Sequence, residues 1–138
     1  MSDTPQPPDI TGTHDERVGL EYLEMGADKV IGRLQIEPHH HQPYGIVHGG
    51  VYCSIVESLA SVGAAAWAGE HGYGGAVGLT NTTDFLRAIS EGSVTATATP
   101  IHQGRSQQLW QVEVTRDSDG KPVAAGRVRL QHIKETSG

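Results

Sequence analysis

Two kinds of hydrophobic pattern divide the chain. Residues 49–68 contain no proline, and their apolar residues recur every three or four positions, which predicts one long α-helix. Elsewhere apolar and polar residues alternate, which predicts strands. The expected strands are residues 20–25, 29–36, 77–86, 94–102, 108–116 and 123–133. Turn-like segments separate the strands, and the five glycines of residues 69–78 are expected to form a connector after the helix.

The order of these elements predicts the fold class. Two strands precede the helix and four follow it, so we expect an α+β domain of order ββαββββ. About six strands would form an antiparallel sheet, with the helix packed across one face. A chain of 138 residues is long enough for one such core. We expect a loose, proline-rich arm at residues 1–17, the domain at residues 18–133 and a tail at residues 134–138.

The predicted helix has two faces of different composition. At about 100° per residue, one apolar stripe is expected to face the sheet. It consists of Val51, Ile55, Leu59, Val62 and Ala66. The opposite side carries Gly50, Ser54, Glu57 and Ser61, flanked by Cys53 and Ala60. These small residues would allow a second chain to approach closely.

Glu57 is the only charged residue between positions 49 and 69. An ordinary position on a solvent-facing helix surface would explain a lone glutamate, but such surfaces usually carry several charged residues. A carboxylate among small residues is unfavourable unless a partner compensates it. Glu57 is therefore a candidate for a functional role.

A second motif leads directly into the helix. It is the run Gln42-Pro43-Tyr44-Gly45-Ile46-Val47-His48-Gly49-Gly50. A helix that begins at Gly49 presents backbone N–H groups that the helix itself does not use, with the positive end of the helix dipole behind them. This arrangement suits the polarisation of a carbonyl group and the stabilisation of a developing oxyanion. Because glycine has no side chain, a substrate can come close.

This motif, with Glu57 and Ser61 on the helix, resembles the hot-dog-fold thioesterases. The similarity is to the branch of phenylacetate-pathway, hydroxybenzoyl-CoA and dihydroxynaphthoyl-CoA thioesterases, which share Gln-Pro-x-Gly-x-x-His-Gly-Gly and a helical Glu followed one turn later by Ser or Thr. Residues 100–105 and 110–113 extend the likeness, which covers roughly residues 18–133. The resemblance implies a single hot-dog domain, its sheet wrapped on the central helix, and hydrolysis of acyl-CoA thioesters with aromatic or medium-chain acyl groups.

The expected roles follow from the chemistry of these residues and from the resemblance. Glu57 would attack the carbonyl or activate the water that does so, and the sequence does not choose between these routes. The Gly49 N–H would hold the oxyanion, and Ser61 would orient the water. Gln42 would donate a hydrogen bond near the carbonyl, and His48 would fix the substrate or the loop. No cofactor is expected, since coenzyme A is part of the substrate.

The spacing of the motif predicts self-association. Gly49 and Glu57 are eight residues apart, hence about 12 Å along a helix, which is too far for both to act on one carbonyl carbon. We therefore expect each site to combine Gly49, Gln42 and His48 of one subunit with Glu57 and Ser61 of another. The active unit would be at least a dimer, and the resemblance implies a tetramer built from two dimers.

The resemblance also suggests where the substrate is held. Arg87, His102, Gly104 and Arg105 are candidates for the coenzyme A phosphates, and Asp84 and Phe85 would lie near the acyl pocket. Ordinary polarity at turns and strand ends would explain the same residues. Two other functions stay open on this fold, namely dehydration of hydroxyacyl thioesters and non-catalytic binding of acyl-CoA.

Other features narrow the class of protein. Ten basic residues against sixteen acidic ones, with no basic run, disfavour nucleic-acid binding. No apolar stretch of about 20 residues is expected to span a membrane, the N-terminus does not resemble a signal peptide, and one cysteine fits a reducing compartment, so we expect a cytoplasmic protein. Cys53 is expected to be a buried packing residue. We expect no metal at His39-His40-His41 and His48, because neighbouring residues of an extended chain point in opposite directions.

Overall fold

The computed structural model describes residues 6–134, so residues 1–5 of the expected arm and 135–138 of the expected tail lie outside it. In chain order, the elements are α1 (His14–Val18), β1 (Glu21–Glu24), β2 (Val30–Gln35), the 3-10 helix η1 (Pro38–His40), α2 (Gly49–Glu70), β3 (Gly75–Phe85), β4 (Ser93–Gln103), β5 (Gln107–Arg116) and β6 (Pro122–Ile133). The predicted order ββαββββ is confirmed. Helix α1, which the sequence pattern did not predict, precedes it.

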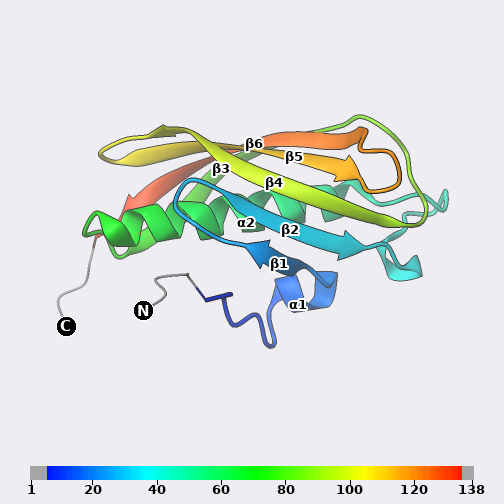
Figure 1. The fold of residues 1–138 in the computed structure, drawn as a ribbon, viewed down its shortest axis with the longest axis horizontal. Coiled ribbons are helices and arrows are strands. Elements are labelled where there is room, and N and C mark those ends of the chain that lie inside the picture. The colour runs from blue at the N-terminus through cyan, green and yellow to red at the C-terminus, as the bar shows by residue number, and fades with distance from the viewer. Residues whose placement is uncertain (1–5, 135–138) are drawn as a thin grey trace.

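The six strands form one antiparallel sheet in the order β1-β2-β4-β5-β6-β3. Figure 1 shows the sheet curving over one side of α2. Strands β4, β5 and β6 form a meander in the middle of the sheet, and β3 returns to pair with β6 over most of its length. Strands β1 and β3 are therefore the two edges, and β3 runs beside α2.

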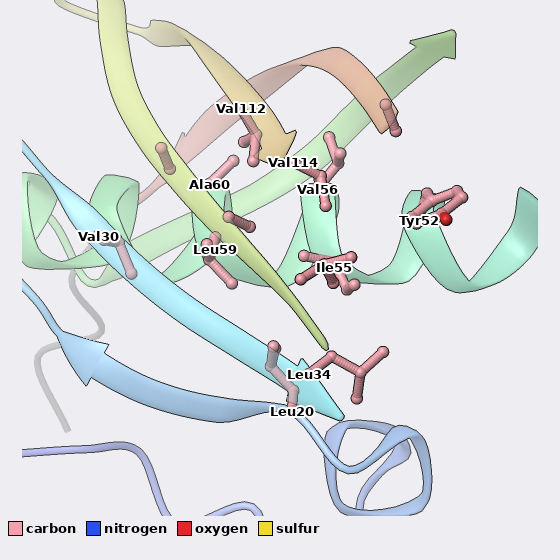
Figure 2. Close-up of a cluster of buried hydrophobic side chains, with 14 of the residues drawn as sticks. Leu20, Val30, Leu34, Tyr52, Ile55, Val56, Leu59, Ala60, Val112 and Val114 are labelled. Carbon is pink, nitrogen blue, oxygen red and sulfur yellow. The ribbon is translucent and has the colours of Figure 1, made fainter. Parts of the chain in front are cut away.

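The core lies between α2 and the sheet (Figure 2). The predicted apolar stripe was only partly right, because Val51, Val62 and Ala66 are half-buried. The buried residues of the helix are Tyr52, Ile55, Val56, Leu59, Ala60, Gly63, Ala64 and Ala68. Ala60, expected on the opposite side, is fully buried. The curved sheet covers a wider sector of the helix than a flat surface would, and that sector includes small residues that carry little hydrophobic signal.

The expectation that no apolar stretch reaches membrane-spanning length was wrong for α2. Its 22 residues include a window of mean hydropathy 1.3, long and apolar enough by composition to cross a bilayer. In this fold, however, the helix is the core helix of the domain, and Ile55, Val56 and Leu59 are fully buried. A helix covered by a sheet along its length needs apolar residues for the same physical reason as a helix in lipid.

Gly63 allows the sheet to approach the middle of α2. A Cβ atom at this position would lie 2.3 Å from Cη2 of Trp110, whose ring is fully buried and whose Nε1 donates to Oε1 of Gln108 (2.8 Å). We therefore expect Gly63→Ala to lower the free energy of unfolding by about 1–3 kcal/mol through overpacking. Urea denaturation measures this change. Gly69→Ala is the control, because no atom of the described residues lies within 4 Å of the added Cβ and alanine favours the helix by up to about 1 kcal/mol. Equal effects at both positions would contradict the account.

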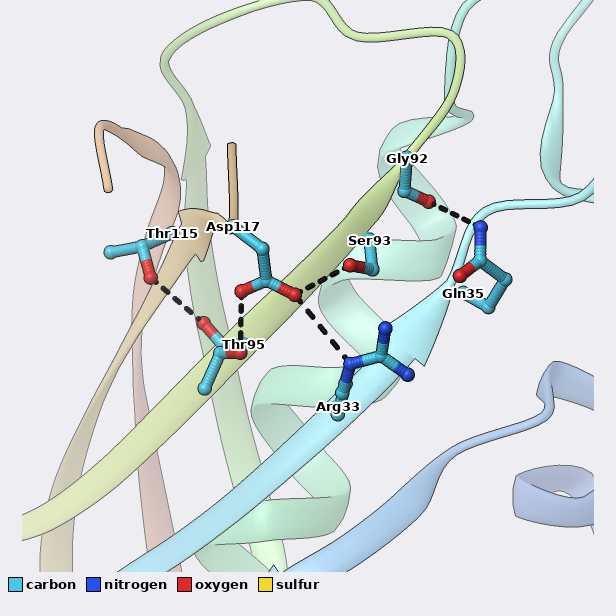
Figure 3. Close-up of polar contacts among 7 residues, drawn as sticks. All are labelled: Arg33, Gln35, Gly92, Ser93, Thr95, Thr115 and Asp117. Atoms are coloured by element: carbon cyan, nitrogen blue, oxygen red, sulfur yellow. Dashed lines mark hydrogen bonds and ion pairs between the residues drawn. The ribbon is translucent and has the colours of Figure 1, made fainter. Parts of the chain in front are cut away.

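A polar cluster joins β2, β4 and the turn after β5 on the face away from the core (Figure 3). The carboxylate of Asp117 accepts hydrogen bonds from Ser93 Oγ and Thr95 Oγ1, both at 2.6 Å, and lies 3.6 Å from Nε of Arg33. Burial acts to raise the pKa of Asp117, but the two hydrogen bonds and the Arg33 charge outweigh it, so the pKa lies below its usual value of 3.8. The ionised form of Asp117 therefore stabilises the fold.

This cluster predicts a pH dependence. A carboxyl group with a lowered pKa in the folded state adds stability above its unfolded pKa and loses that contribution as the pH falls through its folded pKa. We expect Asp117→Asn to be less stable than the wild type near pH 7, and the difference to shrink as the pH is lowered below about 4. Urea denaturation at a series of pH values measures the difference. A difference that stayed constant down to about pH 2 would rule out a contribution from the Asp117 charge.

Candidate active site

The first half of the candidate site is a pocket of about 290 Å³ where α2 begins. It is lined by Gln42, Ile46, Val47, Gly49, Tyr52, Phe85, Leu86, Arg87 and Ala88. Apart from Gln42, Arg87 and the Tyr52 hydroxyl, these side chains are apolar. The pocket is therefore a mostly apolar hollow, open to solvent on one side, next to the positive end of the helix dipole.

The N-terminus of α2 leaves one backbone donor free at this pocket. His48 caps the helix, since its Nδ1 accepts from the N–H of Gly50 (2.8 Å) and its carbonyl accepts from the N–H of Val51 (3.0 Å). Among residues 6–134, the N–H of Gly49 has no hydrogen-bond partner. A Cβ at Gly49 would lie 2.4 Å from the ring of Phe85, so only glycine fits beneath that ring. Because Gly49 lines the pocket, its N–H is a candidate donor to whatever occupies the pocket.

A tight loop holds Gln42 beside Gly49. The backbone N–H of Gln42 donates to the carbonyl of Ile46 (2.8 Å), and Gly45 makes the turn with a φ of +81°. The side-chain Oε1 of Gln42 accepts from the N–H of Tyr44. With the oxygen engaged, the amide nitrogen is the atom of Gln42 that can donate into the pocket.

The second half of the candidate site is a smaller hollow of about 190 Å³ around Glu57. It is lined by His14, Cys53, Ser54, Glu57, Ser58 and Asn81. Glu57 is exposed in the single chain, and its Cδ would lie 3.9 Å from a Cβ on Gly78 of β3, so the carboxylate sits next to the open edge of the sheet. Cys53, expected as a buried packing residue, is half-buried and faces this hollow. Ser61 follows Glu57 by one turn but does not line the hollow.

The N-terminal segment forms one wall of the Glu57 hollow, a role that the sequence pattern did not predict. Nε2 of His14 lies 2.8 Å from Oγ of Ser54. The carboxylate of Asp15 accepts from Ser58 Oγ (2.5 Å) and from the Tyr22 hydroxyl (2.8 Å), which ties α1 to both α2 and β1. Burial, with the neighbouring Asp15, raises the pKa of Tyr22 and keeps it a donor. Helix α1 is too short to give a periodic signal, so pattern reasoning could not find this contact.

The two halves do not meet within one chain. Among residues 6–134, none lines both the pocket at Gly49 and the hollow around Glu57. Gly49 and Glu57 lie eight residues apart on the same straight helix, about 12 Å along its axis. A single chain therefore presents the two predicted sets of groups at separate places on its surface.

The candidate contacts for coenzyme A are also divided. Arg87 lines the Gly49 pocket, and its Nη1 donates to the carbonyl of Pro122 (2.7 Å). His102, near the end of β4, and the turn with Gly104 and Arg105 that follows it lie at the other end of the domain, near the end of α2 (Figure 1). There the Arg105 carbonyl accepts from the Tyr73 hydroxyl. One chain cannot use both groups on the same phosphate.

Asp84 and Phe85 do not share a pocket as expected. They are adjacent on β3, and side chains of adjacent strand residues point to opposite faces of a sheet. Phe85 covers Gly49, whereas Asp84 lines a groove of about 790 Å³ on the outer face of the sheet, beside Thr82 and Arg127. Of the two, only Phe85 is placed to contact an acyl group at the Gly49 pocket.

The histidines that follow β2 have separate partners. Nε2 of His40 lies 2.6 Å from the carbonyl of Val18, and its Nδ1 accepts from the N–H of Glu37. Nε2 of His41 lies 2.7 Å from the carbonyl of Ser90. Within the part of the chain that the structure describes, no three His, Cys, Asp or Glu side chains gather in a way that could hold a metal ion.

Comparison with known proteins identifies the family. A sequence profile of the thioesterase superfamily matches residues 44–123, more than half of the chain. The chain belongs to this superfamily, and its architecture is a single hot-dog domain. The family and the relatives named below support thioester hydrolysis as the general reaction.

Three relatives illustrate the match. Rv1847 of Mycobacterium tuberculosis is 48% identical over 133 residues, which cover 96% of this chain and 94% of that protein. Its solved structure superposes with a TM-score of 0.85, covering 88% of this chain and 97% of the other. The 1,4-dihydroxy-2-naphthoyl-CoA hydrolase of Listeria monocytogenes is 34% identical, covering 75% of this chain and 83% of that protein. The thioesterase HI1161 of Haemophilus influenzae superposes with a TM-score of 0.84 at 26% identity, covering 98% and 99% of the two chains.

Proposed function

We propose that the protein hydrolyses acyl-CoA thioesters to a free acid and coenzyme A. The observation that carries this proposal is the N–H of Gly49, which has no partner among residues 6–134 and belongs to a residue that lines a mostly apolar pocket at the positive end of α2. A donor fixed in that position is what a thioester carbonyl needs as negative charge develops on its oxygen. The relative from Listeria, named as a hydrolase of an aromatic acyl-CoA, supports coenzyme A as the thiol and an aromatic acyl group. The alternative of a medium-chain acyl group rests on the family resemblance alone.

The active unit in this proposal is a dimer, and the open edge of the sheet supports it. Strand β3 has eleven residues, pairs only with β6 among the described strands, and exposes Val77 and Leu79 by about half. Long edge strands with exposed apolar side chains are usually covered, and pairing of β3 with a second β3 would cover both edges at once. Because Glu57 lies beside Gly78 on this edge, such pairing would also enclose the carboxylate. The family resemblance extends the dimer to a tetramer.

Each dimer would then hold two equivalent sites. The Gly49 N–H of one subunit and the Gln42 amide would bind the thioester oxygen, with His48 fixing the loop as the helix cap. Glu57 of the other subunit would either attack the carbonyl carbon or remove a proton from an attacking water, which Ser61 would orient. In the first route a mixed anhydride forms, the C–S bond breaks and the thiolate leaves; water then cleaves the anhydride and regenerates the carboxylate. No cofactor is expected to take part, because coenzyme A is a portion of the substrate.

Arg87 of the Gly49 pocket and the turn with His102, Gly104 and Arg105 would contact coenzyme A from different places on the assembled enzyme. Their separation within one chain fits a long substrate that runs along the subunit interface. Phe85 would cover the acyl group near the thioester.

The proposal is tested by incubating the purified protein with a panel of aryl- and alkyl-CoA thioesters and measuring free thiol together with the mass of the acyl product. We expect stoichiometric release of thiol and free acid. Loss of 18 Da from a hydroxyacyl-CoA with the thioester intact would instead show a dehydratase. Tight acyl-CoA binding without turnover over hours would show a non-catalytic binding protein.

A further inference from the structure

The hydroxyl of Tyr52 is buried without a hydrogen-bond partner. It is the one buried side-chain polar atom in that state among the residues that the structure describes, and Tyr52 itself is 2% exposed. Buried hydroxyl groups are normally paired, since an unpaired one loses its hydrogen bond to water with no replacement. This exception indicates that the hydrogen-bond partner of the Tyr52 hydroxyl is a group outside the single folded chain.

Tyr52 lies at the pocket where the substrate is proposed to bind. It is three residues after Gly49, so the two lie on the same side of α2, and side chains on a helix lean toward its N-terminus. Figure 2 shows Tyr52 beyond Ile55, toward the start of the helix. Its ring is 6.2 Å from that of Phe85, and the remaining neighbours in the pocket are mostly apolar, including Ile46, Val47 and Leu86.

We propose that Tyr52 determines substrate specificity by donating a hydrogen bond from its hydroxyl to an oxygen atom on the acyl group. This inference rests on the proposed function. The thioester carbonyl has its own donor in the Gly49 N–H at the end of the helix, whereas Tyr52 lies one turn further along and is almost fully buried. Its partner is therefore a part of the acyl group that enters the pocket beyond the carbonyl. Acyl groups with a hydroxyl or keto oxygen would be preferred over plain hydrocarbon groups.

The charge state of Tyr52 suits this role. Burial raises its pKa to about 12, so the hydroxyl stays protonated and able to donate at any pH where the fold is expected to be stable. A neutral donor surrounded by apolar side chains pairs best with a neutral oxygen, because a charged group would lose its hydration on entering the pocket.

The variant Tyr52→Phe removes only the hydroxyl. The test compares kcat/KM for benzoyl-CoA with the 2-, 3- and 4-hydroxybenzoyl esters, and for octanoyl-CoA with its 3-hydroxy and 3-oxo forms. For at least one matched pair we expect the wild type to prefer the oxygenated ester by about tenfold or more, and Tyr52→Phe to lose that preference. Because the missing hydroxyl has no partner among the described residues, the Tm should stay the same or rise. Loss of selectivity without loss of stability is a result that a structural role cannot give.

Tyr22→Phe is the matched control, since the Tyr22 hydroxyl already donates to Asp15. We expect it to lower the Tm and leave the selectivity unchanged. The inference is overturned if Tyr52→Phe keeps the wild-type ratios, if the wild type prefers no oxygenated ester, or if Tyr52→Phe changes the assembly state in size-exclusion chromatography. In each of these cases, the proposed function is still supported if the wild type hydrolyses the panel of esters. A wild type that hydrolyses none of the esters overturns the proposed function, and this inference with it.

Discussion

Replacing Glu57 with glutamine is expected to lower kcat for acyl-CoA hydrolysis by about 10³-fold or more, with the fold intact. Glutamine keeps the size of the side chain but can neither attack a carbonyl carbon nor accept a proton from water. Stability should change little, because Glu57 is exposed in the single chain and has no hydrogen-bond partner in the described residues. Thiol release measures kcat, and thermal denaturation followed by circular dichroism measures stability.

Glu70→Gln is the matched control for this variant. Glu70 is an exposed glutamate at the other end of the same helix, outside the Glu57 hollow and the Gly49 pocket. Its loss should leave both kcat and Tm at wild-type values. If Glu57→Gln kept more than about a tenth of the wild-type kcat, Glu57 would be neither the nucleophile nor the base.

The second large effect is expected for Gly49→Val. The first atom of the new side chain would lie 2.4 Å from the ring of Phe85, so the ring must move, and the side chain would occupy the space in front of the free N–H. Phe85 is 57% exposed and can turn outward, so the protein should still fold. Loss of a preorganised oxyanion donor commonly costs about 10²–10³ in kcat, and a fall of at least this size is expected in the thiol-release assay.

Gly69→Ala, at the far end of α2, controls for replacing a helical glycine and should retain full activity. A Gly49→Val enzyme with wild-type kcat would show that the start of α2 does not bind the reacting carbonyl.

The order of the elements could be predicted because their periodicities are strong. The helix was expected at residues 49–68 and runs from Gly49 to Glu70, and each predicted strand overlaps an observed one to within two residues at either end. The start of β3 was harder to place, since Gly75 and Gly78 suggested a connector. Pairing with β6 makes this segment a strand all the same, because backbone hydrogen bonds need no side chain.

Burial around the helix was less predictable than the helix itself. A stripe drawn from Val51, Val62 and Ala66 follows the most hydrophobic residues, while the curved sheet also buries Tyr52 and Ala60. Tertiary packing decides which side of an almost wholly apolar helix is covered, and a one-dimensional pattern does not contain that information.

The candidate site, too, was only partly predictable from the sequence. The motif brought Gln42 and Gly49 to one pocket, since short-range sequence fixes a loop and the start of the helix that follows it. The sequence could not reveal Tyr52 or His14, because a buried tyrosine looks like any core residue and an isolated histidine carries no periodic signal. Their positions depend on contacts between elements that are far apart in the chain.

The central claim, that each site is built from two subunits, is tested most directly by mixing Glu57→Gln and Gly49→Val chains, through co-expression or joint refolding, and measuring thiol release. If each site takes Glu57 from one subunit and Gly49 from the other, a mixed dimer has one site with both wild-type residues and one with neither. Random pairing should then restore about 25% of the wild-type activity from two inactive parents. If the mixture stayed as inactive as its parents although mixed dimers had formed, the two groups would not act together across an interface.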